Sequence, residues 1–142
     1  MFSITSRLKF NRIFKSVNET HCRYRVVLGS AGSGKSVNVA QDFILKLSDT
    51  KYTGANLLVI RKSEGTNRYS TFAELQAVIF RMCGEYWEDF WIINSSRLMI
   101  TSKITGNSII FRGVNDKKQR EKLKSITFPK GKLVWVWIEE AT

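Results

Sequence analysis

The sequence has few of the residues that build disulfide frameworks and metal centres. Its 142 residues include two cysteines, Cys22 and Cys83, and one histidine, His21. The cysteines are far apart and form no Cys-x-x-Cys pair, so we interpret both as reduced thiols of a cytoplasmic protein, packed as small hydrophobic side chains. With so few nitrogen and sulfur ligands, a protein-held zinc site is not expected, and chemistry that needs two histidines is excluded.

Long apolar runs, internal repeats and low-complexity tracts are also missing. No run approaches the roughly 20 apolar residues of a membrane span. Acidic residues are outnumbered, because 12 Asp and Glu stand against 23 Lys and Arg, for a net charge of +11. This charge indicates an anionic partner, either nucleic acid or a membrane surface, and does not distinguish between the two. The length fits one domain whose core needs no disulfide or metal.

The first residues combine basic and apolar side chains. From Met1 to Val17 there are four basic residues, and no acid precedes Glu19. The composition resembles an organellar transit peptide. Because the next motif follows so closely, we favour a basic lead-in over residues 1–22 that packs beside the first strand.

A glycine-rich octet separates two structured segments. The apolar run 24–28 is too short for a helix and indicates a buried strand, whereas apolar positions after Lys35 recur at helical spacing. The octet GSAGSGKS, from Gly29 to Ser36, matches the pattern G-x-x-x-x-G-K-[ST]. Its flanks argue against a flexible glycine/serine linker. Residues 24–47 therefore predict a strand, a phosphate-binding loop and a helix.

This loop has the chemistry to bind the triphosphate of ATP. Unpaired amides and the helix dipole attract anions at a helix N-terminus, and glycine lets phosphate oxygens approach the backbone. We expect Lys35 to reach the β- and γ-phosphates and to act in catalysis, and Ser36 to ligate Mg²⁺. The predicted ATP-binding residues are Gly29, Ser30, Ala31, Gly32, Ser33, Gly34, Lys35, Ser36 and Val37.

The rest of the chain alternates strand and helix patterns. We predict a strand at 55–60, a helix between Ser70 and Gly84, and a charged surface helix over 117–124. Short strand-like runs fill 86–114, with a hairpin turn at Gly106-Asn107. The alternation indicates an α/β layered domain, with helices on both faces of the sheet and the region 86–114 as an inserted β-hairpin.

Two acids follow the apolar run 133–138. At the C-terminal tip of a buried strand, acids emerge where α/β proteins bind ligands. Successive residues point to opposite faces, so we assign Glu139 to Mg²⁺ and Glu140 to activation of the attacking water. The alternative is a solvated acidic pair. A second acid favours hydrolysis by a motor-type ATPase over transfer by a nucleotide kinase, for which we locate neither an acceptor pocket nor a lid.

Four ordered blocks resemble the large subunit of tailed-bacteriophage terminases, most closely the PBSX-type group. The blocks are Arg23 to Phe43, Val59 to Ile79, Ile109 to Ile126 with its "FRG…KLKS" pattern, and WIEEAT from Trp137 to Thr142. The resemblance implies a P-loop NTPase of the ASCE, RecA-like type with ATP and Mg²⁺ as cofactors. It places Glu139 and Glu140 in the Walker B segment, over 133–140.

The resemblance also implies a biological setting. Members of this family are ATP-driven motors that form a ring on the viral portal protein and translocate double-stranded DNA, with the terminase small subunit as another partner. This implies work in the cytoplasm of the bacterial host and no membrane partner.

The resemblance does not assign a role to several of the basic residues. Several relatives carry an arginine in the phosphate loop, where this chain has Ala31 and Ser33. Arg61 and Arg68 are our candidates for a catalytic guanidinium that meets the γ-phosphoryl charge, within one subunit or across a ring interface. The alternative is a surface or DNA-contacting arginine. Likewise, the basic residues of 117–124 either contact DNA phosphates or form a solvated helix face.

Family members continue through a coupling motif, further strands and a nuclease domain, whereas this sequence stops two residues after Glu140. We therefore assign no nuclease site and expect a single, incomplete ATPase domain over 1–142, truncated after the Walker B strand. A missing strand would expose apolar surface in the sheet, so we expect weak or no turnover. Two alternatives remain, a non-catalytic basic remnant that binds DNA or a partner, and another P-loop motor such as a helicase.

Overall fold

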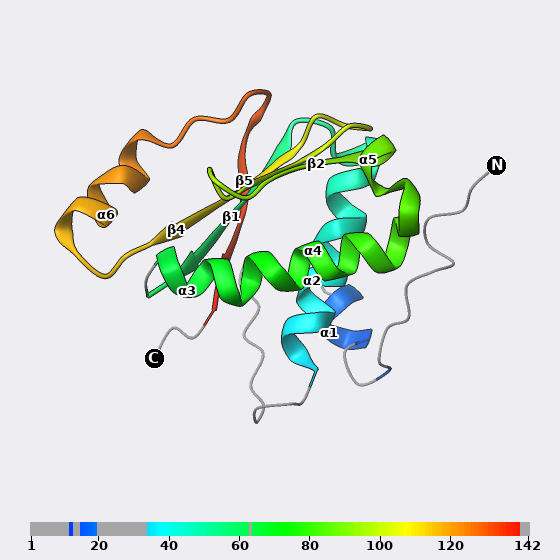
Figure 1. Ribbon diagram of the computed structural model, residues 1–142, viewed down its shortest axis with the longest axis horizontal. Coiled ribbons are helices and arrows are strands. Elements are labelled where there is room, and N and C mark those ends of the chain that lie inside the picture. The colour runs from blue at the N-terminus through cyan, green and yellow to red at the C-terminus, as the bar shows by residue number, and fades with distance from the viewer. Residues whose placement is uncertain (1–11, 13–14, 20–33, 63, 140–142) are drawn as a thin grey trace.

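The computed structural model describes residues 12, 15–19, 34–62 and 64–139 (Figure 1). Within them, helices and strands form the mixed α/β fold that was predicted. The predicted strand 24–28 and most of the glycine-rich octet lie outside the described residues, as do His21 and Cys22. In chain order the elements are α1 (Lys15–Glu19), α2 (Lys35–Ser48), the 3₁₀ helix η3 (Thr50–Tyr52), β1 (Ala55–Arg61), α3 (Glu64–Tyr69), α4 (Thr71–Cys83), η4 (Gly84–Tyr86), α5 (Trp87–Phe90), β2 (Trp91–Asn94), β3 (Met99–Ser102), β4 (Ser108–Gly113), α6 (Lys117–Lys122), η5 (Leu123–Ser125) and β5 (Lys132–Ile138).

The described strands form one mixed sheet in the order β2-β3-β4-β1-β5. Both β4 and β5 pair parallel with β1, whereas β2, β3 and β4 pair antiparallel in sequence. The predicted turn at Gly106, which has a φ of 77°, joins β3 to β4. The segment 86–114 was predicted as an inserted hairpin. It continues the main sheet, because β4 lies directly beside β1 with Leu57 opposite Ile109.

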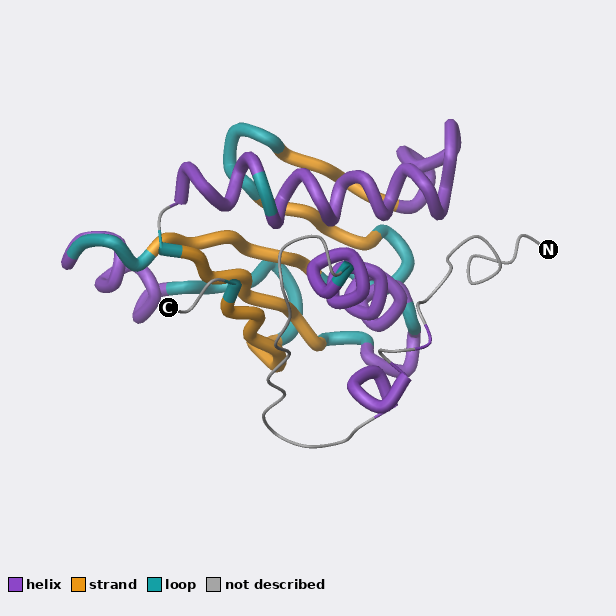
Figure 2. The backbone as a smooth tube through the Cα atoms, turned by 90° about the horizontal axis from the view of Figure 1, so that it is seen from below, coloured by secondary structure: helices purple, strands orange, loops and turns teal. Residues whose placement is uncertain are grey.

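Both long helices, α2 and α4, pack on the same face of this sheet. Strand residues that share a face, such as Leu57 with Ile109 and Val59 with Phe111, form the core together with apolar side chains of both helices. In Figure 2 α3 and α4 follow one another along the sheet, with strands behind and below them. Helices on both faces were predicted, and the described residues differ from this, since α6 lies beyond the end of β4 (Figure 1).

The core contains no charged side chain from these helices. The Cys83 side chain is buried within it, as expected for a small hydrophobic side chain. Among the described helices none is long and apolar enough to span a membrane.

The apolar strand β5 is covered on one face. We expected residues 133–138 to be buried, but Val136 and Ile138 are 48% and 58% exposed. Trp137, which lies between them, is only 7% exposed. Alternate side chains of a strand point to opposite faces, and α2 covers the face of Trp137. The apolar composition of β5 is therefore no guide to its burial.

Buried amides join the loops at the amino ends of the strands. The Asn107 side chain, 1% exposed, donates to the carbonyl oxygens of Leu47 at 3.2 Å and Tyr52 at 2.9 Å. It accepts a 2.8 Å hydrogen bond from the Gly54 amide. Asn56 plays a similar part, because it bonds the backbone on both sides of Gly131 and accepts from the Ser108 amide. These contacts fix where α2 ends and β1, β4 and β5 begin.

Candidate functional site

The site begins at the first turn of α2. Gly34 is the N-cap residue, with φ 84° and ψ 6° in the left-handed region that glycine adopts without strain. Its carbonyl accepts the first helical bond from the Asn38 amide at 3.0 Å. The helix therefore starts at Lys35, as the sequence predicts, and the backbone amides of this first turn have no earlier helical carbonyl to bond.

Ser36 and Glu139 meet although 103 residues separate them. The Ser36 hydroxyl donates a 2.9 Å hydrogen bond to Glu139 Oε1. Glu139 directly follows β5, and its amide donates to the Ile60 carbonyl at 3.0 Å, which holds it at the carboxyl end of the sheet. The structure thus joins the start of α2 to the tip of β5, the two places that sequence reasoning selected. Glu140 lies outside the described residues.

A third side chain completes this contact. The indole N–H of Trp137 donates a 3.1 Å hydrogen bond to Glu139 Oε2, so each carboxylate oxygen accepts from a different element. Sequence reasoning missed Trp137. The signal available was the alternation of the strand, which places residues 135, 137 and 139 on one face.

Aromatic packing sets the position of α2 over β5. The Phe43 ring stacks on Trp137 at 6.2 Å and 29°, and it contacts Trp135 at 6.0 Å. Phe43 lies two helical turns after Ser36, on the same side of α2. Aromatic pairs of this kind contribute about 0.5–1.5 kcal/mol each beyond their buried area. Packing between Phe43 and Trp137 therefore brings Ser36 towards Glu139.

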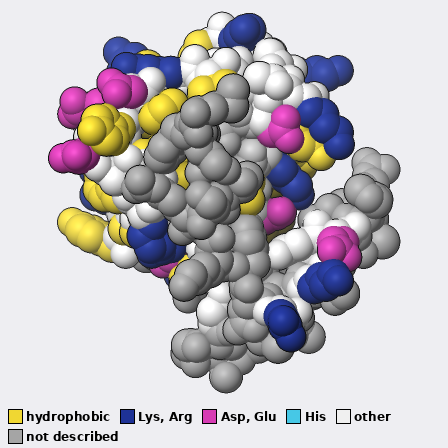
Figure 3. Space-filling model, turned by 90° about the vertical axis from the view of Figure 1, so that its right-hand side faces the viewer, with side chains coloured by type: hydrophobic (Ala, Val, Ile, Leu, Met, Phe, Trp, Pro, Cys, Tyr) yellow, Lys and Arg dark blue, Asp and Glu magenta, His cyan; other side chains and the backbone are white. Residues whose placement is uncertain are grey.

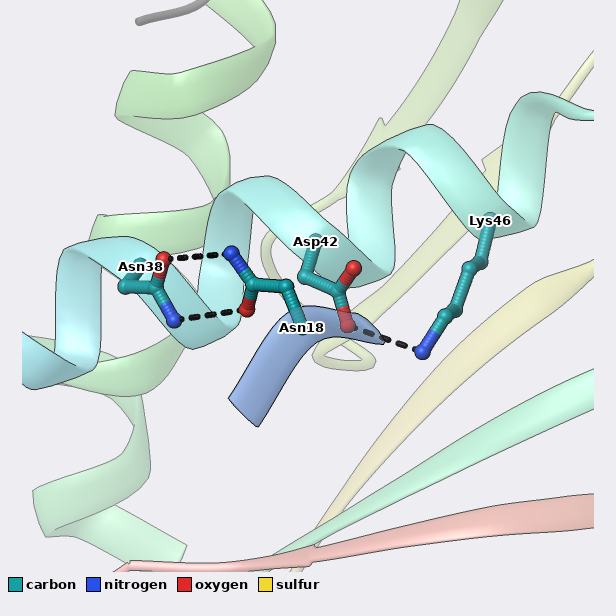
Figure 4. A network of polar contacts seen from close by, with 4 residues as sticks. All are labelled: Asn18, Asn38, Asp42 and Lys46. Atoms are coloured by element: carbon teal, nitrogen blue, oxygen red, sulfur yellow. Dashed lines mark hydrogen bonds and ion pairs between the residues drawn. The ribbon is translucent and has the colours of Figure 1, made fainter. Parts of the chain in front are cut away.

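A second contact holds α2 from another side (Figure 4). Asn18 of α1 and Asn38 of α2 exchange two amide hydrogen bonds of 3.0 and 2.9 Å. One turn further along α2, Lys46 and Asp42 form an ion pair of 2.8 Å. The predicted lead-in 1–22 thus includes a short helix that packs on α2, since buried Asn38 has its side-chain amide satisfied there.

The oxygen atoms at this site are suitable ligands for a hard cation. Ser36 and Glu139 offer hydroxyl and carboxylate oxygens, which Mg²⁺ prefers, and a magnesium ion takes its other ligands from phosphate and water. Among the described residues, no three His, Cys, Asp or Glu side chains gather into a metal cluster.

The two candidate arginines occupy different places. Arg61 ends β1, the strand next to β5, and its guanidinium donates to the Ser70 hydroxyl. Ser70 is the N-cap residue of α4, as predicted, although its side chain caps no backbone amide. Arg68 donates to the Ser95 carbonyl at 2.7 Å, in the turn between β2 and β3. That turn lies three strands from β5, about 14 Å across the sheet, so only Arg61 lies beside the site.

Comparisons with known proteins agree with the resemblance seen in the sequence. The family model "Phage terminase large subunit" matches residues 21–142. The chain is 35% identical over 133 residues to the "Terminase, large subunit" of Bacillus phage SPP1, which covers 92% of this chain and 29% of that protein. It is 31% identical over 124 residues to the "PBSX phage terminase large subunit" of Bacillus subtilis (strain 168), which covers 84% of this chain and 24% of that protein. The chain spans less than a third of the length of these curated relatives. It belongs to the phage terminase large subunit family.

Proposed function

We propose that this chain binds ATP with Mg²⁺ and supplies the ATP-hydrolysing part of a motor that packages double-stranded DNA into a viral procapsid. The observation that carries the proposal is the 2.9 Å contact between Ser36 and Glu139. It joins the first turn of a helix, where anions bind, to a carboxylate, which attracts a hard cation. Membership of the terminase family supports the same function.

Each residue of the site has a role in this proposal. The loop 29–34 and the first amides of α2 bind the phosphates, and Lys35 contacts the β- and γ-phosphates. Ser36 and Glu139 hold Mg²⁺, which when bound neutralises charge that develops on the phosphoryl oxygens. Glu140 orients or deprotonates the attacking water. Arg61 is the arginine best placed to reach a γ-phosphate, since β1 adjoins β5.

Double-stranded DNA is the proposed polymer substrate. We define the basic ridge as the exposed cations of α6 and η5, which are Lys117, Lys118, Arg120, Lys122 and Lys124. On the face shown in Figure 3 the Lys and Arg side chains are spread around the outline with acidic side chains between them. The basic ridge, interrupted by one acid, Glu121, is a better candidate for contact with DNA phosphates. The terminase small subunit, the portal protein and further copies of the chain are the proposed protein partners, in the cytoplasm of the bacterial host.

Titration of the protein with a fluorescent ATP analogue and Mg²⁺ tests this function. Lys35→Ala should weaken binding about 10- to 100-fold, because it removes a charged contact with the phosphates. Lys51→Ala is the matched control, since Lys51 is exposed in η3, which follows the opposite end of α2. Equal affinities of the wild-type protein and Lys35→Ala would favour a non-catalytic basic protein. ATP hydrolysis stimulated by single-stranded and not by duplex DNA would favour a helicase.

A further inference from the structure

The Glu139 carboxylate is fixed by donors from two elements, and only one of them has a role in the proposed function. Ser36 of α2 donates to Oε1, and Trp137 of β5 donates to Oε2 at 3.1 Å. We propose that Trp137 is a positioning residue that orients the Glu139 carboxylate towards the first turn of α2 and thereby sets the affinity for Mg²⁺ in the presence of ATP. This inference rests on the proposed function.

An indole is chemically suited to this task. Its N–H donates a hydrogen bond and accepts none, so it does not compete with the carboxylate for a cation. It is also neutral, so the full negative charge of Glu139 remains available to attract Mg²⁺. A lysine or arginine at the same position would pair with the carboxylate and weaken that attraction.

The indole is itself held rigidly. Trp137 is 7% exposed and stacks on Phe43 with ring planes 29° apart. A long, solvated side chain would lose rotamer entropy on fixing the carboxylate, whereas this ring is already immobilised by packing. Partners that orient a metal ligand in this way commonly change metal affinity when they are removed.

One aromatic stack thus serves both halves of the site. Phe43 lies two turns after Ser36 on α2, and Trp137 lies two residues before Glu139 on β5. Contact between the two rings fixes how far the Ser36 hydroxyl is from the carboxylate. The indole N–H then fixes the rotation of the carboxylate, which packing alone does not determine.

Trp137→Phe separates these two effects, because phenylalanine keeps an aromatic ring on Phe43 and removes the donor. Trp135→Phe is the matched control, since Trp135 packs on the same Phe43 ring and on Tyr52. Dissociation constants for ATP are measured with Mg²⁺ and with a chelator. We expect Trp137→Phe to lose about 10- to 100-fold in affinity with Mg²⁺ and to match the wild-type protein with chelator. Trp135→Phe should match the wild-type protein in both conditions.

Two results would overturn this inference alone. One is equal affinity of both variants with Mg²⁺, and the other is a loss of the same size with and without Mg²⁺, which indicates a structural role. Absence of ATP binding by the wild-type protein would instead overturn the proposed function and this inference with it.

A second measurement needs no substitution of Trp137. In an amide NMR spectrum of the folded protein, Glu139→Ala should move the indole N–H signal of Trp137, because its acceptor is removed. The buried indole of Trp91, which has no hydrogen-bond partner among the described residues, supplies the internal reference. An unmoved Trp137 signal would contradict the hydrogen bond on which the inference depends.

Discussion

Asn107 offers a test of how this fold is held together. Its side chain makes three hydrogen bonds to the backbone, with Leu47, Tyr52 and Gly54, at 2.8 to 3.2 Å. Each such bond contributes about 0.5–1.5 kcal/mol net, and the partners left behind are partly or fully buried. Asn107→Ala should therefore lower the free energy of unfolding by about 2–4 kcal/mol. The total free energy of unfolding of a domain is typically about 5–15 kcal/mol, so this loss would be a large fraction of it.

The assay is urea unfolding followed by circular dichroism, with thermal unfolding as a second readout. A loss of about 2–4 kcal/mol in a domain of this size corresponds to a fall in Tm of about 6–16 °C. The Leu47 carbonyl still accepts a 2.6 Å bond from Thr105, which limits the loss. Asn115→Ala is the control, because Asn115 is exposed and should change stability by less than about 0.5 kcal/mol. Equal stability of the two variants would refute the reasoning.

Two further predictions concern the turn before β5 and the basic ridge. Gly131→Ala should destabilise the protein by more than about 2 kcal/mol, since Gly131 has a φ of 78° and an added Cβ would lie 2.2 Å from the Gly54 oxygen. In α3, a Cβ added at Gly65 would meet nothing within 4 Å, so Gly65→Ala should stabilise the protein slightly. Urea unfolding should therefore show changes in the free energy of unfolding that have opposite signs for the two variants. Neutralising the basic ridge with glutamine should weaken binding to duplex DNA and reduce its salt dependence by about one unit of slope per phosphate contact, measured by fluorescence anisotropy. Lys103→Gln, in the turn between β3 and β4, should change neither the affinity for duplex DNA nor its salt dependence.

Local patterns predicted most of the elements. The spacing of apolar residues after Lys35 predicted α2, and Gly84, which adopts a positive φ, was predicted to end α4. The short apolar runs in 86–114 predicted strands, and the structure has β2, β3 and β4 there. Each of these predictions depends on interactions within about one or two turns of the chain, which sequence periodicity reports directly.

Long-range pairing was beyond such patterns. That β4 pairs with β1 makes the region 86–114 part of the main sheet, and nothing in its local sequence distinguishes this from an inserted hairpin. The same holds for Arg68, which reaches Ser95 because α3 lies near the turn between β2 and β3. Asn107 was selected as a turn residue, and its bonds to Leu47 and Tyr52 come from segments more than fifty residues away.

The sequence by itself determined the chemistry at the two ends of the site, a lysine and serine that open a helix and a glutamate that ends an apolar strand. Only the tertiary structure decided that Ser36 and Glu139 share a hydrogen bond and that Trp137 holds the other carboxylate oxygen. The physical reason is that residue type and spacing fix which groups can donate and accept. The packing of Phe43 on Trp137, between elements about a hundred residues apart, fixes which of those groups meet.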